Sequence, residues 1–132
     1  MFESRVACIC GLPGIGSVGK VAADYLSNAL KCSSIKPFYS HSFPSQVMVS
    51  DGLAELMHAE LLRSQDKENI FVLSGDTQPL DVQGMYQLAG EILQAIESEG
   101  VTDVITLAAF VGDATAKILG SATDPESAAV LH

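Results

Sequence analysis

The sequence predicts an α/β protein with a three-layer α/β/α arrangement, in which helices cover both faces of a mainly parallel central sheet. Apolar strand-like runs alternate with helix-like segments along the 132 residues. In the second half the order is strand, helix, strand, which implies a right-handed parallel crossover. The chain is 48% hydrophobic but only 6% aromatic, with no Trp, so we expect an aliphatic core. Helices packed on a buried sheet fit such a composition.

The first half begins with a short buried strand over 5–10, which a loop rich in Gly and Pro joins to a helix. Apolar residues of that helix recur on one face, and they are Val18, Val21, Ala22, Tyr25, Leu26 and Ala29. A second strand is expected over 35–40, cut by Pro37, and a third over 46–50. Asp51-Gly52 is then the strongest two-residue hairpin signal in the chain.

The segment LAELMHAELL, residues 53–62, is ambiguous. Its apolar spacing suits one face of a helix, because Leu53, Leu56, Met57 and Leu61 recur at helical intervals. The Asp-Gly hairpin signal before it, however, requires a returning strand. The residues alone leave both possibilities open.

The second half begins with NIFVLS, residues 69–74, a continuous apolar run typical of a strand buried on both faces. Pro79 is a favoured first helical residue, and we expect a long helix from there to Gly100. Its apolar stripe consists of Val82, Met85, Ala89, Ile92, Leu93 and Ile96. Another buried strand is expected over 103–110. The last segment is expected to hold a final strand and a helix that opens at Asp124-Pro125.

Charge and cysteine content limit the classes of function. The net charge of −9 opposes binding to nucleic acid or anionic membranes, since such binding relies on Lys and Arg displacing counterions. Three cysteines cannot all pair within the chain, and their pattern suits buried thiols in a reduced, cytoplasmic protein. No C-x-x-C or H-x-x-x-H spacing occurs, so we expect no metal and no cofactor. No segment approaches the roughly 20 apolar residues needed to cross a bilayer.

The loop GLPGIGSVGK, residues 11–20, satisfies two phosphate-binding patterns. Gly14, Gly16 and Gly19 give the G-x-G-x-x-G of dinucleotide-binding turns, and Gly14, Gly19 and Lys20 give most of a P-loop. Each pattern lacks its most specific residue. A valine follows Lys20 where a P-loop has Ser or Thr, and no Asp or Glu lies between positions 24 and 51 to hold a ribose.

Two interpretations of this loop follow. In the first, Gly11, Gly14 and Gly16 permit positive φ in a tight turn, and Gly19 lets the helix lie close to the sheet. In the second, the protein is a nucleotide- or phosphate-binding enzyme that uses the carboxyl edge of the sheet, where ligands of open α/β folds collect. The site of this alternative consists of Gly14, Gly16, Ser17, Gly19, Lys20, Asp76 and Gln78.

No catalytic residue is predicted with either interpretation. Asp113 falls in a loop expected at the same edge, but the aspartates there have no evident metal or His partner. An Asp in such a loop is usually a turn former or a helix cap. His41 and His58 are expected near strand edges, where a solvated or packed His is commoner than a catalytic one.

Three blocks in order resemble the archaeal branch of the proteasome assembly chaperone family: GLPGIGSVGKVAADYL, FPSQVMVSDG, and IFVLSGDTQP with GMYQLAGEILQAIESEGVTDVITLAAF. The resemblance covers about residues 10–110 and continues weakly into GSATDPE. It implies a fold similar to purine nucleoside phosphorylases, with no established catalytic residues. It also implies a strand, not a helix, after the Asp-Gly turn.

The same resemblance implies a function. Characterised members of that family assist assembly of proteasome α subunits as oligomeric binding proteins. We therefore expect a non-enzymatic, homo-oligomeric chaperone-like protein whose partners are proteasome α-type subunits. Family members commonly carry a longer C-terminal half, so residues 1–132 are expected to form a single α/β domain that lacks this part.

Overall fold

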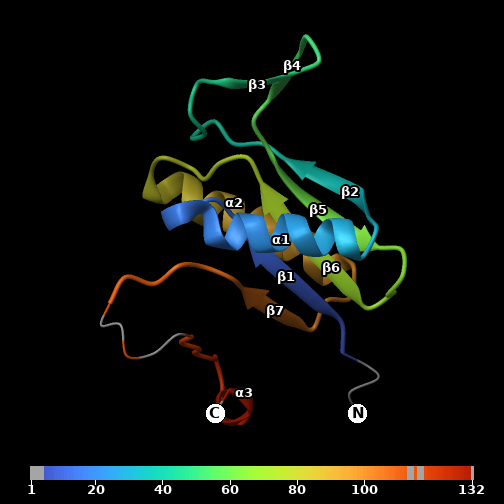
Figure 1. Ribbon diagram of the computed structural model, residues 1–132, viewed down its shortest axis with the longest axis vertical. Helices are drawn as coiled ribbons and strands as arrows, with labels where there is room; N and C mark the ends of the chain where they lie inside the picture. Colours follow the sequence, from blue (N-terminus) through green and yellow to red (C-terminus); the bar gives the residue numbers. More distant parts are fainter. Residues whose placement is uncertain (1–4, 113–114, 116–117, 132) are drawn as a thin grey trace.

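The computed structural model describes residues 5–112, 115 and 118–131 and contains a five-stranded sheet with helices on both faces (Figure 1). The strands of this sheet lie in the order β2 (Cys32–Phe38), β5 (Ala59–Ser64), β6 (Ile70–Gly75), β1 (Ala7–Gly11) and β7 (Asp103–Thr106). β1 pairs in parallel with β6 and β7, whereas β5 is antiparallel to both β2 and β6. The sheet is therefore mixed, because β5 runs against the other four strands, and the prediction of a mainly parallel sheet is not confirmed.

The two long helices, α1 (Val18–Ala29) and α2 (Val82–Ser98), cover opposite faces of the sheet. Successive strand residues point to opposite faces, and in β6 Phe71 and Leu73 belong to the core cluster that includes α2. Ser74 instead donates to Asp24 of α1, with 2.6 Å between Oγ and Oδ1. Figure 1 shows α1 in front of the sheet and α2 behind it. The likeness to nucleoside phosphorylases stays a prediction.

The core lies mainly between the sheet and α2. Its buried residues come from β1, β2, β5, β6 and α2, and they are Cys8, Phe38, Ala59, Leu61, Phe71, Leu73, Leu88, Ile92, Ala95 and Ile96. Leu, Ile and Ala make up most of this cluster, but Phe38, Phe71 and Cys8 also belong to it, so the core is not wholly aliphatic, contrary to the expectation. Burying each of the Leu, Ile and Phe side chains in this cluster contributes about 1.5–3 kcal/mol.

The ambiguous segment 53–62 is strand. β3 (Val47–Ser50) and β4 (Leu53–Leu56) form a separate two-stranded sheet, and the chain then enters β5. Asp51 and Gly52 connect the two strands with φ of 53° and 78°, as a type I′ hairpin turn requires. The predicted hairpin is confirmed, and it projects from the body of the molecule (Figure 1).

The second half differs from its prediction at two boundaries. α2 begins at Val82, not Pro79, because the Asp81 carboxylate accepts a bond from the Gly84 amide at 2.6 Å and caps the helix there. β7 ends at Thr106, well before residue 110. The Leu107 amide still donates to the Cys10 carbonyl at 2.8 Å, and the described residues after it leave the sheet.

The predicted helix ends are otherwise confirmed. Gly100 follows α2 with φ 81°, and α3 (Pro125–Val130) has Pro125 in its first turn and Asp124 as its cap. The final strand expected before α3 is not found among residues 115 and 118–123. Within the described ranges, no helix has the length and apolar character to cross a membrane.

Candidate functional site

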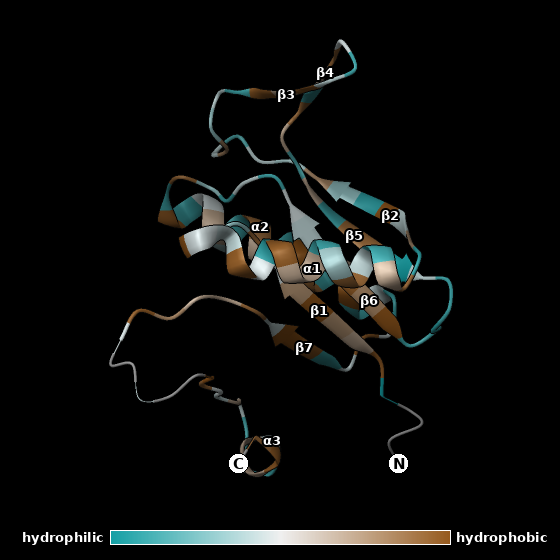
Figure 2. Cartoon of the chain, viewed as in Figure 1, coloured by the Kyte–Doolittle hydropathy of each residue, from teal (hydrophilic) through white to brown (hydrophobic). Residues whose placement is uncertain are grey.

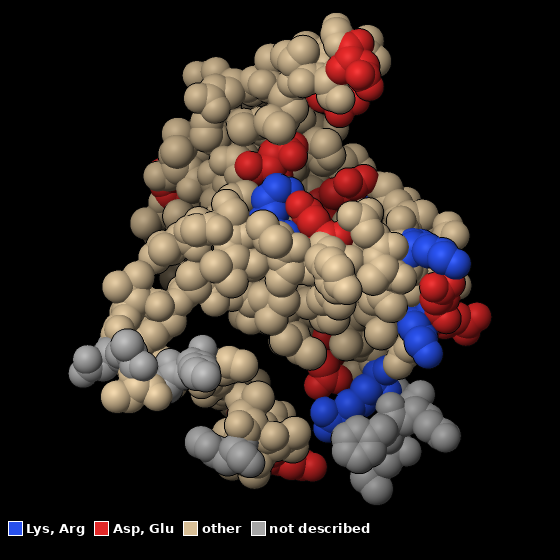
Figure 3. Space-filling view, in the orientation of Figure 1, with Lys and Arg blue, Asp and Glu red and all other residues tan. Residues whose placement is uncertain are grey.

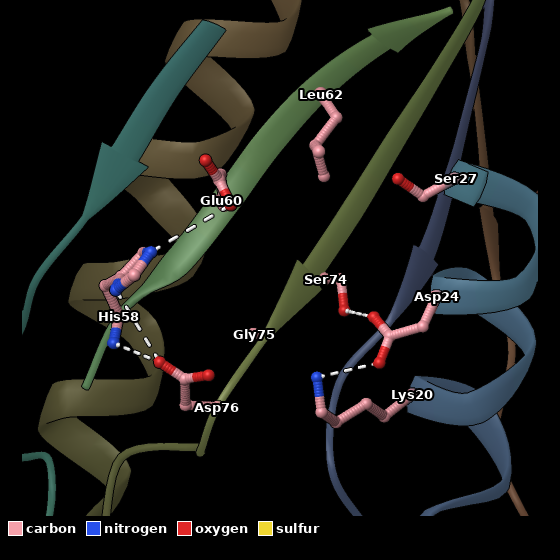
Figure 4. Close-up of a pocket in the computed structure, with 9 residues that line it drawn as sticks. All are labelled: Lys20, Asp24, Ser27, His58, Glu60, Leu62, Ser74, Gly75 and Asp76. Atoms are coloured by element: carbon pink, nitrogen blue, oxygen red, sulfur yellow. Dashed lines mark hydrogen bonds and ion pairs between the residues drawn. The ribbon is translucent and has the colours of Figure 1, made fainter. Parts of the chain in front are cut away.

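A polar cavity of about 120 Å³ lies between α1 and the face of β5 and β6 that α1 covers (Figure 4). It lies near the edge where β1, β6 and β7 end, because Gly75 is the last residue of β6 and Asp76 follows it. β5 runs the other way, so its first residues reach the same edge. The cavity is lined by Lys20, Asp24, Ser27, His58, Glu60, Leu62, Ser74, Gly75 and Asp76.

On the helix side, a chain of polar contacts joins α1 to β6. Lys20 Nζ lies 3.0 Å from Asp24 Oδ2, one helical turn away, and Ser74 Oγ donates to the other carboxylate oxygen at 2.6 Å. Figure 4 shows both contacts meeting at Asp24. Ser74 is buried, so a hydrogen bond to a charged acceptor is the means of satisfying its hydroxyl. Asp24 therefore fixes both α1 against β6 and the direction of Lys20.

On the opposite side, His58 lies between two carboxylates. The Asp76 amide donates to the His58 carbonyl at 3.0 Å, and the His58 amide donates to Asp76 Oδ2 at 3.1 Å. The same Oδ2 lies 3.6 Å from His58 Nδ1. Glu60 Oε2 lies 3.9 Å from Nε2, and the Tyr39 ring packs 5.6 Å from the imidazole, centre to centre. A proton on Nδ1 is within reach of the Leu56 carbonyl at 3.1 Å. These contacts hold the imidazole in place from several elements.

The charge around the cavity opposes a phosphate ligand. Three carboxylates, those of Asp24, Glu60 and Asp76, face one lysine and one histidine. Lys20 is already neutralised by Asp24, so a phosphoryl group there would meet more negative than positive charge. Among the described residues, no three His, Cys, Asp or Glu side chains are arranged to hold a metal ion.

The thiols are protonated at neutral pH. Burial raises the pKa of Cys8 to about 12, with the neighbouring Cys10 charge adding to the effect, and burial raises that of Cys10 to about 11. The pKa of Cys32 is also raised by burial. Because the thiolate is the nucleophilic form, these cysteines are suited to packing and not to covalent chemistry.

Two of the four glycines in the 11–20 loop allow the backbone of neighbouring segments to pack closely. A Cβ on Gly11 would lie 1.9 Å from the Gly19 carbonyl oxygen, and a Cβ on Gly19 would lie 2.1 Å from that of Leu107. Gly16 has the predicted positive φ, 62°. The same prediction is wrong for Gly14, which is extended at φ −153°, and for Gly11, whose φ is not positive. Ser17 takes the second positive φ, 52°.

The predicted phosphate-site residues are only partly brought together. Lys20 and Asp76 line the cavity. The Gln78 amide donates to the Pro13 carbonyl, which ties the loop after β6 to the Gly-rich loop. Gly14, Gly16, Ser17 and Gly19 are used in the turn and in packing, as described above. Asp113 lies outside the described residues.

Sequence reasoning missed Asp24, His58, Glu60 and Ser74 as cavity residues. His58 was expected to be a packed or solvated edge residue, and its contacts with Asp76 and Tyr39 agree with a packed one. The missing information was the antiparallel direction of β5, which carries Glu60 beside Ser74. Glu60 lies between the buried Ala59 and Leu61, and a charged residue that alternates with buried apolar ones is the signal that could have placed it on the other face of the sheet.

The chain is similar in sequence and in fold to proteins of two archaea. It is 38% identical over 122 residues to an uncharacterised protein of Methanocaldococcus jannaschii, covering 89% of this chain and 47% of the relative. The crystal structure of Pyrococcus furiosus PbaB, an archaeal proteasome activator, has a TM-score of 0.70 and 34% identity, over 77% of this chain and 45% of that one.

A second structure agrees at the level of the fold. P. furiosus PbaA, an archaeal homolog of proteasome-assembly chaperone, has a TM-score of 0.63 and 23% identity, covering 86% of this chain and 46% of PbaA. The chain thus spans about half the length of these relatives. The model of the PAC2 family matches residues 8–131. The chain belongs to the PAC2 family, and the resemblance to archaeal proteasome assembly chaperones is confirmed.

Proposed function

We propose that this chain is a non-enzymatic, proteasome assembly chaperone-like protein of the cytoplasm, which forms homo-oligomers and binds proteasome α-type subunits. The observation that carries the proposal is the likeness to PbaB, an archaeal proteasome activator, at 34% identity and a TM-score of 0.70. The name of PbaA, a homolog of proteasome-assembly chaperone, supports the same class of function.

The surface supports a binding role. Large apolar side chains are exposed on several elements, including Met85, Tyr86 and Leu93 on α2 and Val104 and Ile105 on the outer strand β7. Contiguous exposed apolar surface usually marks a site of protein association. The backbone groups on the free edge of β7 are also open to pairing with another chain. We assign the contacts between copies to these α2 and β7 surfaces.

The cavity supports a non-enzymatic role. Its polar groups bond chiefly to one another, as in the contacts of Asp24 with Lys20 and Ser74. A nucleophile needs a neighbouring base that accepts its proton, yet the Ser74 hydroxyl points at a carboxylate that already pairs with a lysine. Such an arrangement braces α1 against the sheet.

The proposal is tested by mixing the purified chain with recombinant archaeal proteasome α subunits and measuring mass by size-exclusion chromatography with light scattering. We expect the chain alone to exceed 13.9 kDa in solution mass. We also expect a new species of defined stoichiometry in the mixture. A monomeric chain would refute the oligomer, and separate elution of the two proteins would refute α-subunit binding.

A further inference from the structure

The β3–β4 hairpin presents an apolar face that no other part of the described chain covers. Val47 lies opposite Leu56, and Val49 lies opposite Ala54. Cross-strand partners share a face, so these four side chains form one surface without a polar member. All residues of both strands are exposed. Figure 2 shows the strands coloured brown, away from the body of the molecule.

The opposite face of the hairpin is also partly apolar. Met48 and Leu53 are exposed there beside Ser50 and Glu55. A two-stranded hairpin is at best marginally stable alone in water, and needs packing to gain independent stability. A hairpin with apolar groups on both faces therefore suits insertion into a groove better than contact with a flat surface.

The apolar face continues into a cavity of about 320 Å³ at the base of the hairpin. Leu56 belongs to both, and Tyr39, Phe43 and Met57 are among the other residues that line the cavity. The volume lies within the range of pockets that accept ligands. It is large enough for one aliphatic or aromatic side chain of a partner to serve as an anchor.

The negative charge of the hairpin indicates which kind of partner would bind it. The sequence has no Lys or Arg between Lys36 and Arg63, whereas Asp51 lies at the hairpin turn and Glu55 in β4. Figure 3 shows acidic atoms at the end of the hairpin. Two such hairpins would repel each other, so a second copy of this acidic chain is disfavoured. A basic surface would complement them.

We propose that the hairpin and its basal cavity form a docking site for a partner protein that has an apolar groove rimmed by Lys or Arg and an apolar side chain to fill the cavity. Val47, Val49 and Leu56 bury against the groove. Asp51 and Glu55 meet the basic rim. The docking site deepens the proposed function. Its apolar and acidic character does not depend on that function, but the identification of the partner as a proteasome α subunit does.

The chemistry of the site is tested with a fluorescent peptide of three Lys-Lys-Leu-Phe repeats, its binding measured by anisotropy against the full chain. A peptide with Glu in place of each Lys and one with Ser in place of Leu and Phe are the references. We expect both references to bind at least about tenfold more weakly. Equal binding of all three, or no binding of the first, would overturn the proposal.

Matched variants locate the binding. Val49 and Val82 are both 67% exposed, one on the hairpin and one at the start of α2. Val49→Thr keeps the β-branched shape that strands favour, and it should weaken peptide binding about fivefold by placing a hydroxyl in an apolar contact. Val82→Thr should leave binding unchanged. If both variants bind like the wild type, the peptide binds elsewhere and the proposal fails.

A second pair tests the charge. Glu55→Gln should weaken binding about two- to threefold and flatten its dependence on salt, whereas Glu91→Gln on the exposed face of α2 should change neither. The wild type and these four variants are then tested with archaeal proteasome α subunits. If the peptide binds at the hairpin but the α subunits do not bind the chain, the proposed function is refuted and the docking site is not. If the α subunits bind and Val49→Thr does not weaken that binding, the docking site is refuted and the proposed function is not.

Discussion

A methyl group on Gly19 would lie 2.1 Å from the carbonyl oxygen of Leu107. The first turn of α1 therefore touches the backbone that follows β7, and side chains larger than hydrogen do not fit between them. Gly19→Ala should force the helix away from the sheet and lower the free energy of unfolding by roughly 1–3 kcal/mol, the range of overpacking. Urea denaturation followed by circular dichroism measures the change.

Gly90→Ala is the control for this variant. Gly90 lies inside α2, and a Cβ there would meet nothing within 4 Å. Replacing glycine by alanine in an open helical position stabilises by roughly 0.5–1 kcal/mol. Equal effects of the two substitutions would contradict the close contact at Gly19.

Gly52→Ala should act on the hairpin alone. Gly52 has φ 78°, and an alanine in the left-handed region costs about 1–2 kcal/mol. Hydrogen exchange should show about fivefold or greater loss of protection at the β3 and β4 amides, with β1 and β6 unchanged. A uniform loss over all strands would mean that the hairpin folds as one unit with the sheet.

The two thiols of β1 predict a pH dependence of stability. Their pKa values in the folded chain, about 12 for Cys8 and about 11 for Cys10, exceed the ordinary 9.0. The unfolded chain loses these protons first, so the free energy of unfolding should fall as pH rises above about 9 toward 11. Below about pH 8 the thiols are protonated in both the folded and the unfolded chain and contribute almost no slope.

Denaturation with urea at pH 8, 9 and 10, with reductant, measures this dependence. Other groups titrate in the same range, so the comparison is with a Cys8→Ala, Cys10→Ala variant, whose curve should be flatter. The same slope in both proteins would show that these thiols do not cause it.

Lys20→Met tests the alternative that the Gly-rich loop binds phosphate. Lys20 is paired with Asp24 one turn along α1, and both side chains are partly exposed. Exposed i,i+4 pairs contribute about 0.3–0.5 kcal/mol, so stability should change little. We expect no thermal shift of the wild type with nucleotides or inorganic phosphate. A phosphate-dependent rise in melting temperature that Lys20→Met abolishes would restore the phosphate-binding interpretation.

Local signals in the sequence identified most of the elements. Asp51-Gly52 specified the hairpin because both residues tolerate positive φ, and the apolar run 69–74 became the buried strand β6. Asp124-Pro125 marked the start of α3 through cap chemistry. The signal at Pro79 was misleading, since the Asp81 carboxylate competed successfully for the first helical amides.

Features that depend on residues far apart in the chain could not be predicted from local sequence patterns. The direction of β5 depends on where the chain re-enters the sheet after the hairpin, and no local pattern records it. The cavity follows from that direction, because an antiparallel β5 brings His58 and Glu60 to the edge where β6 ends. The sequence analysis predicted Lys20 and Asp76 at that edge because loops after the carboxyl ends of parallel strands share one edge of a sheet. β1 and β6 are parallel, so this prediction holds for them.

The point where the hairpin leaves the sheet has a consequence for how such proteins diversify. Phe38, the last residue of β2, is paired with Ala59, the first of β5. Residues 39–58 therefore leave the sheet and return to it at the same pair of residues. Within that segment, all residues of β3 and β4 are exposed, so the length and the side chains of the hairpin can change while the strands of the main sheet keep their register. The partner-binding surface on the hairpin can then change in evolution while the main sheet of the same domain keeps its fold.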